Sequence, residues 1–189
     1  MKTFVYIAIL SFMCACSEKT SLRPIDAKDL NEKIEFPDDW MGYWTCELHI
    51  YKNNKKQQSI PMAIDHEFTD IPGRYEWAII YGEDTITGRR DYYLETVNAK
   101  NGKYRIDEQN GIYLDSYLND NVMVSYFDVQ GNTNMTSYTH QGETILFEVF
   151  ASSTKVNSIT GDTIIGIDTI PSVKNYPINA YQRAVLSKR

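Results

Sequence analysis

The feature that most constrains the fold of this chain is the alternation of apolar and polar residues after residue 40. Its clearest case is residues 42–51, where every second position carries an apolar side chain: Trp44, Cys46, Leu48 and Ile50. Successive side chains of a strand point to opposite faces of the sheet, so this spacing predicts one buried face and one face in solvent. We therefore expect the folded domain to open on a strand of a β-sheet.

Several later segments repeat this pattern. The positions expected to face inward are Ile60, Met62, Ile64, His66 and Phe68, then Tyr75, Trp77, Ile79 and Tyr81, then Arg90, Tyr92, Leu94 and Thr96. Turn signals, among them Asn101-Gly102 and Asn110-Gly111, separate further strands up to a closing strand at 178–186, with an excursion or extra hairpin at 152–174. The pattern predicts an all-β fold over residues 40–189, an antiparallel up-and-down β-barrel of about 8–10 strands.

The N-terminus carries a predicted export signal over residues 1–15. Lys2 precedes an apolar run that ends at Met13, too short to span a bilayer but suited to a signal peptide. The sequence Met13-Cys14-Ala15-Cys16 resembles the lipobox of bacterial lipoproteins, in which the acceptor cysteine is acylated and becomes the new N-terminus. This resemblance implies lipidation of Cys16 and a membrane partner held through acyl chains. The alternative is an ordinary cleaved signal without lipid.

Residues 16–39 are polar, contain Pro24 and Pro37, and are predicted to form a lipidated N-terminus followed by a flexible tether. Ser17 stands where lipoproteins retained at an inner membrane carry an aspartate, so we expect a lipid-anchored protein of the cell envelope, at the outer membrane if the cell has one. The formal net charge of -6 argues against nucleic acid as a partner.

A second resemblance concerns the barrel. Gly42-x-Trp44 at the head of the first strand is similar to the first-strand motif of the lipocalins, and the strand number fits the wider calycin group, which includes ten-stranded fatty-acid-binding barrels. The resemblance implies a cup that holds a small apolar molecule. Lipocalins also pack a basic side chain of the last strand across this tryptophan, a place that Arg183 would take.

The residues expected to line a ligand site are Trp44, His66, Trp77, Tyr81, Arg90 and Tyr92. They would border a cavity of several hundred cubic ångströms, with His66 or Arg90 in its wall. An inward arginine beside a tyrosine suits a carboxylate, because the guanidinium fork matches it in shape and charge. Alternatively, Arg90 lies in water at a strand end and His66 is a satisfied core histidine.

Catalytic chemistry is not indicated. His49, His66 and His140 lack metal-ligand spacing, and no nucleophile elbow, metalloprotease motif or phosphate loop occurs, so we expect no enzyme activity, metal or cofactor. Two functions remain. Either the anchored barrel binds a small hydrophobic ligand such as a lipid or fatty acid, or the barrel is filled and its outer tyrosines bind an envelope protein or a glycan. Those tyrosines are Tyr43, Tyr51, Tyr93, Tyr113 and Tyr117.

Overall fold

The computed structural model describes residues 33–189. The predicted signal peptide, Cys16 and most of the predicted tether lie outside the described residues. Within the described part the only helical turns are two short 3₁₀ turns, η1 (Asp38–Trp40) and η2 (Ala99–Asn101). All remaining regular structure is β, as the alternation predicts.

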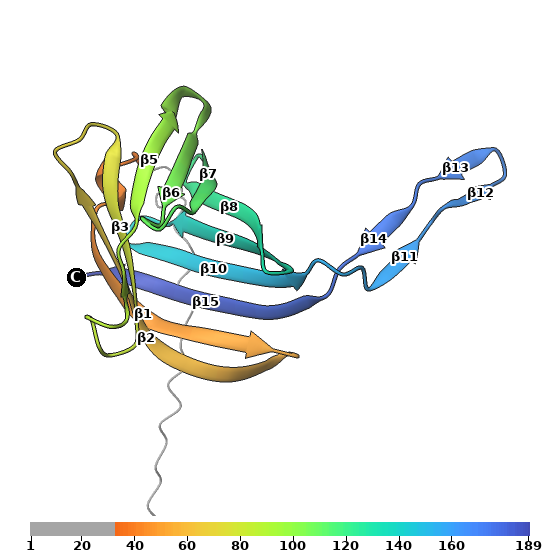
Figure 1. The fold of residues 1–189 in the computed structure, drawn as a ribbon, viewed down its shortest axis with the longest axis horizontal. Helices are drawn as coiled ribbons and strands as arrows, with labels where there is room; N and C mark the ends of the chain where they lie inside the picture. The colour runs from red at the N-terminus through yellow and green to blue at the C-terminus, as the bar shows by residue number, and fades with distance from the viewer. Residues whose placement is uncertain (1–32) are drawn as a thin grey trace, which may run out of the picture. The chain divides into compact units, whose positions relative to one another are not determined.

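Ten antiparallel strands form a closed up-and-down barrel (Figure 1). They are β1 (Gly42–Lys52), β2 (Lys55–Phe68), β3 (Arg74–Tyr81), β5 (Tyr93–Asn98), β6 (Lys103–Asp107), β7 (Tyr113–Asn119), β8 (Val122–Val129), β9 (Asn132–His140), β10 (Thr144–Ser153) and β15 (Ile178–Lys188). Each strand pairs with the next one in this series, and β15 closes the barrel by pairing with β1. The two-residue strand β4 (Arg89–Arg90) pairs with β3. The predicted barrel is confirmed.

The strand register follows the sequence pattern. Trp44 pairs with Ile64 of β2, and Ile64 pairs with Ile79 of β3, so apolar side chains from neighbouring strands meet on the inner face. The turn between β1 and β2 is formed by Asn53 and Asn54, which have φ values of 51° and 58°. A two-residue hairpin turn needs positive φ at both positions, which asparagine tolerates.

One end of the barrel is filled by residues that precede the first strand. Trp40 of η1 is fully buried, with its ring 6.3 Å from that of Trp77. Phe36 makes edge-to-face contacts with Trp40 and with Tyr75 and Tyr104 of the barrel. Residues 33–39, which the sequence analysis places in the tether, therefore include a segment that packs against this end, which we call the plugged end. The opposite end, where β1 finishes and β2 begins, we call the open end.

A long ribbon leaves the open end between β10 and β15 (Figure 1). It contains two small antiparallel ladders, one of β11 (Ser158–Thr160) with β14 (Val173–Asn175) and one of β12 (Thr163–Ile165) with β13 (Asp168–Ile170). The sequence pattern indicated an excursion or an extra hairpin here, and the structure shows the hairpin.

Two details differ from the sequence pattern. A single inward strand was expected to run from Arg90 through Thr96, but the chain breaks into β4 and β5 around Asp91, and Arg90 is exposed. Lys188, not Arg183, lies across the tryptophan of the first strand, with its Nζ 5.2 Å from the Trp44 ring centre. Arg183 pairs with His49 instead and faces outward, because it alternates along β15 with the buried Ala184 and Leu186.

Candidate binding cavity

The barrel interior contains a cavity of about 200 Å³ toward the open end. Its apolar wall is formed by Ile79, Ile106, Leu114, Phe127, Phe147 and Val149. Its polar atoms come from Tyr81, Tyr92, Glu108, Ser125, Asn134, Thr136, Tyr138 and Gln182. Ligand sites are mostly apolar with a few placed polar groups, and this lining has that character. The volume lies below the ~300–1,000 Å³ usual for ligand sites, so the cavity suits only a small molecule.

Three tyrosine hydroxyls gather around this cavity, on β3, on the segment before β5 and on β9. Burial raises the pKa of Tyr81 to about 12 and raises the pKa of Tyr138 strongly. The pKa of Tyr92 is also raised, chiefly by burial and further by the neighbouring carboxylate of Glu108. These phenols are therefore neutral near pH 7 and offer a ligand both a hydrogen-bond donor and an acceptor.

The floor of the cavity is the packed aromatic cluster of the plugged end. The imidazole of His66 stacks on Trp77 with ring centres 3.4 Å apart, and Tyr138 meets Trp77 edge to face. Both His66 and Trp77 are fully buried. Nδ1 of His66 lies 3.2 Å from the Trp40 carbonyl oxygen, to which it donates. No partner for Nε2 of His66 is found among residues 33–189.

This environment holds His66 neutral. Burial lowers the pKa of His66 to about 3, although the hydrogen bond to Trp40 opposes the change. His140 occupies a related position beside Trp40 and Trp44, and its Nε2 lies 3.0 Å from the Asp39 carbonyl oxygen. Burial also lowers the pKa of His140. Both histidines act here as flat core side chains that each hold one carbonyl of the segment closing the barrel.

The structure separates the six residues predicted to line a ligand site. Tyr81 and Tyr92 border the cavity. Trp44, His66 and Trp77 belong to the packed core of the plugged end, behind the cavity floor. His66 and Arg90 are not among the residues that line the cavity: the plug covers His66, and Arg90, which pairs with Ile79, is exposed. Arg90 donates from Nη1 to the carbonyl oxygens of Thr87 and Arg89.

Several cavity residues were not singled out from the sequence. Gln182 was detectable, because it shares its face of the closing strand with Ala184 and Leu186, which are buried. Asn134, Thr136 and Tyr138 likewise occupy alternate positions of β9. Glu108 had no signal, since it follows β6 in an Asp-Glu-Gln-Asn stretch that is typical of a turn.

A second and larger hollow of about 790 Å³ lies outside the plugged end. Lys33, Asp39, Glu143 and Lys188 contribute charged side chains to its wall, and its large apolar contributors are Ile34 and Trp44. This lining fits a small apolar molecule less well than that of the interior cavity.

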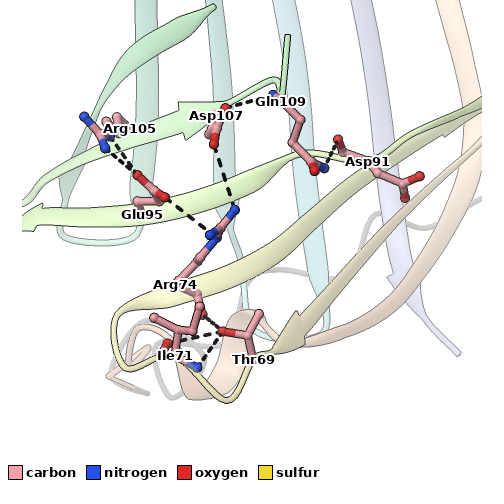
Figure 2. A network of polar contacts seen from close by, with 8 residues as sticks. All are labelled: Thr69, Ile71, Arg74, Asp91, Glu95, Arg105, Asp107 and Gln109. Carbon is pink, nitrogen blue, oxygen red and sulfur yellow. Dashed lines mark hydrogen bonds and ion pairs between the residues drawn. The ribbon is translucent and has the colours of Figure 1, made fainter. Parts of the chain in front are cut away.

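The outer face of β3, β5 and β6 carries a network of charged side chains (Figure 2). Glu95 accepts a hydrogen bond of 2.8 Å from Nε of Arg105 and lies 3.7 Å from Nε of Arg74. Arg74 also lies 3.9 Å from Asp107 and covers the Tyr93 ring at 3.7 Å. Glu95 and Asp107 are thus paired with arginines, an arrangement that ties β3, β5 and β6 together.

Among residues 33–189 no three histidine, cysteine, aspartate or glutamate side chains are grouped so that they could hold a metal ion. No helix within these residues has the length and apolar character needed to cross a bilayer. The thiol of Cys46 is half-buried, and burial raises its pKa to about 12, so it resembles a small apolar core group more than a nucleophile.

Comparison with known proteins assigns no family to the chain. No protein-family model matches the sequence, and no curated protein is similar to it. The structure itself shows a closed ten-stranded antiparallel β-barrel with a buried aromatic cluster.

Proposed function

We propose that this barrel binds a small, largely apolar molecule in the cavity at its open end, without catalysing a reaction. The observation that carries the proposal is the asymmetry of the interior. One end is filled by an aromatic plug, while the other keeps a cavity with apolar walls and unionised phenols. A barrel that only needed stability would gain by filling this space, because unfilled volume forfeits packing contacts.

The volume of the cavity limits which ligands can fit. About 200 Å³ does not enclose a long-chain fatty acid, so a lipid would be held by its end or by part of its chain. A small aromatic or branched aliphatic molecule with one hydrogen-bonding group fits better. Its apolar part would contact Phe127, Phe147 and Val149, and its polar group would reach the hydroxyls of Tyr81 or Tyr92.

Native mass spectrometry of the full chain tests this proposal. We expect a co-purifying small molecule, or binding of added indole, in the parent protein. Replacing Val149 by tryptophan fills the cavity and should abolish binding. The matched control Leu146→Trp introduces the same side chain on the same strand, at a position paired with the outward and exposed Val185. Equal binding by both variants, or none by the parent, would refute the proposal.

We also propose that the protein is a lipoprotein of the cell envelope, anchored through acyl chains on Cys16. The support is the lipobox-like Met13-Cys14-Ala15-Cys16 after a short apolar run. Several acyl chains hold a protein at a membrane stably, whereas one holds it only marginally. Mass spectrometry of the mature N-terminal peptide tests whether Cys16 carries acyl chains. A diacylglyceryl adduct on Cys16 is expected, and an unmodified peptide beginning elsewhere would contradict it.

A second candidate function is favoured by the exposed aromatic surface of β7 and β8. Tyr113, Tyr117 and Tyr126 are 54%, 45% and 71% exposed, and Arg105 and Lys103 lie over the first two rings. Aromatic and arginine side chains are enriched at interaction surfaces, so an envelope protein or a glycan is the alternative partner. Retention of the parent, but not of a Tyr117→Ser/Tyr126→Ser variant, on a glycan array or by cross-linking in cell envelopes would favour this function.

A further inference from the structure

The ribbon between β10 and β15 extends away from the barrel and receives no strand from it (Figure 1). Its ladders consist of β11 with β14 and of β12 with β13, and these strands pair with nothing else in the described part of the chain. Both long edges of the ribbon therefore expose backbone donors and acceptors, a template for pairing with another strand. An isolated two-stranded ribbon is also only marginally stable in water.

Apolar side chains crowd this ribbon although little packs on them. At its tip Ile164, Ile165 and Ile167 are 71%, 66% and 99% exposed. Val156, Ile159, Val173, Tyr176 and Ile178 are exposed nearer its root. The register explains why they stay exposed: Ile159 pairs with Lys174, Ile164 with Thr169 and Ile165 with Asp168, so no rung sets two aliphatic side chains together. Contiguous exposed apolar surface of this kind marks an interaction site.

The charges on the ribbon differ between its root and its tip. Lys155 and Lys174 lie toward the root, whereas Asp162 and Asp168 lie in the half toward the tip. The ribbon is thus basic at one end, acidic at the other and neutral as a whole. Two acidic residues beside the tip disfavour its insertion into a bilayer, where an aspartate is costly.

We infer that the ribbon packs against the ribbon of a second copy of this chain, antiparallel to it and related by a twofold axis. The tip of each copy then lies along the root of the other, and Asp168 of one copy faces Lys174 of the second. A twofold contact is self-complementary by necessity, and a ribbon with opposite charges at its two ends satisfies that condition. The pairing covers the exposed isoleucines and occupies one open edge of each ribbon.

Cross-linking between two variants that each carry one introduced cysteine tests this geometry. Full-length chains carrying Asp168→Cys are mixed with full-length chains carrying Lys174→Cys under mild oxidation. We expect a disulfide-linked dimer in the mixture and much less in either variant alone, since equivalent positions lie at opposite ends of the paired ribbons. The control mixture uses Asp115→Cys, an exposed position on β7, with Lys174→Cys. Cross-linking that is equal in the control, or absent from the test mixture, overturns the inference.

Sedimentation of the full chain gives an independent readout through charge. The parent should show a concentration-dependent species of twice the chain mass. Asp168→Lys should weaken that dimer about tenfold, because both contacts become repulsive, and the double swap Asp168→Lys/Lys174→Asp should restore it. A parent that stays monomeric, binds only lipid vesicles through the ribbon, or dimerises equally well in all three forms contradicts the pairing. Cavity binding is unaffected by these exposed changes, so failure here is separable from failure of the proposed function.

Discussion

Replacing His66 by phenylalanine should remove a large part of the acid sensitivity of this barrel. His66 is fully buried, its ring stacks on Trp77, and its pKa is lowered to about 3. A histidine in the unfolded chain has a pKa of ~6.5. At pH values between the folded and the unfolded pKa, the unfolded state therefore binds a proton that the folded state does not bind. Stability is thus unaffected above about pH 6.5 and falls as the pH drops below it.

The size of the stability loss follows from the pH range between the unfolded and the folded pKa of His66. Each pH unit below ~6.5 costs about 1.4 kcal/mol per histidine, so His66 alone removes about 2 kcal/mol between pH 6.5 and pH 5. The full effect, reached near pH 3, approaches about 5 kcal/mol as an upper bound. His140 contributes in the same direction, because its pKa is lowered as well. The phenylalanine variant keeps a flat ring against Trp77 and removes the titrating group together with its hydrogen bond to Trp40.

Urea denaturation followed by tryptophan fluorescence at pH 7 and pH 5 measures the effect. The parent should lose about 2 kcal/mol more between these pH values than His66→Phe. His66→Phe also removes the hydrogen bond from Nδ1 to the Trp40 carbonyl oxygen, which still accepts from Nε1 of Trp44 at 3.3 Å. This cost is the same at both pH values. Met123→Ala, a buried position without a titrating group, should lose stability while keeping the parental pH dependence. An equal loss by the parent and by His66→Phe would refute a buried, neutral His66.

Three further outcomes are expected. Gly102→Ala should lower the free energy of unfolding by about 2 kcal/mol in urea titrations, because a Cβ there would clash with the Leu118 carbonyl oxygen at a φ of +61°. Gly131→Ala, with a φ of +77° but open space around it, should cost less. Phe147→Ala should cost about 3–5 kcal/mol by the same titration, since this ring is fully buried between the cavity and Tyr138. The Cys46 thiol should resist iodoacetamide at pH 8 in the folded chain and react once urea unfolds it, as mass spectrometry would show, because burial raises its pKa.

Much of the barrel follows from local rules that the sequence displays. Alternation assigned Trp44, Leu48, Ile64 and Ile79 to the interior, and all four are buried. In a strand with alternating apolar residues, the face of one side chain determines the face of all the others. A shift of the register by one residue would expose the whole apolar set. The closing strand was also recognisable, since an up-and-down barrel needs a last strand that returns to the first.

The site was harder to predict because it depends on what enters the barrel from outside. The alternating pattern around His66 does not show that Phe36 and Trp40 cover one end of the barrel. It also does not show that the cavity lies toward the other end. The break after Arg90 depends on a loop that folds back on β3, a tertiary effect without a local signal. Lys188 takes the place expected for Arg183 because the barrel closes at a register that one strand alone does not define.

Methyl NMR of the full chain titrated with indole tests most directly whether the open end of the barrel is a binding site. We predict saturable shifts confined to Ile79, Ile106, Leu114 and Val149, which line the cavity. The methyl signals of Ile64, Ile145 and Leu186 at the packed end should stay unchanged. Val149→Trp should remove these shifts. Shifts spread evenly through the interior, shifts confined to the outer tyrosine surface, or none at all would contradict this prediction.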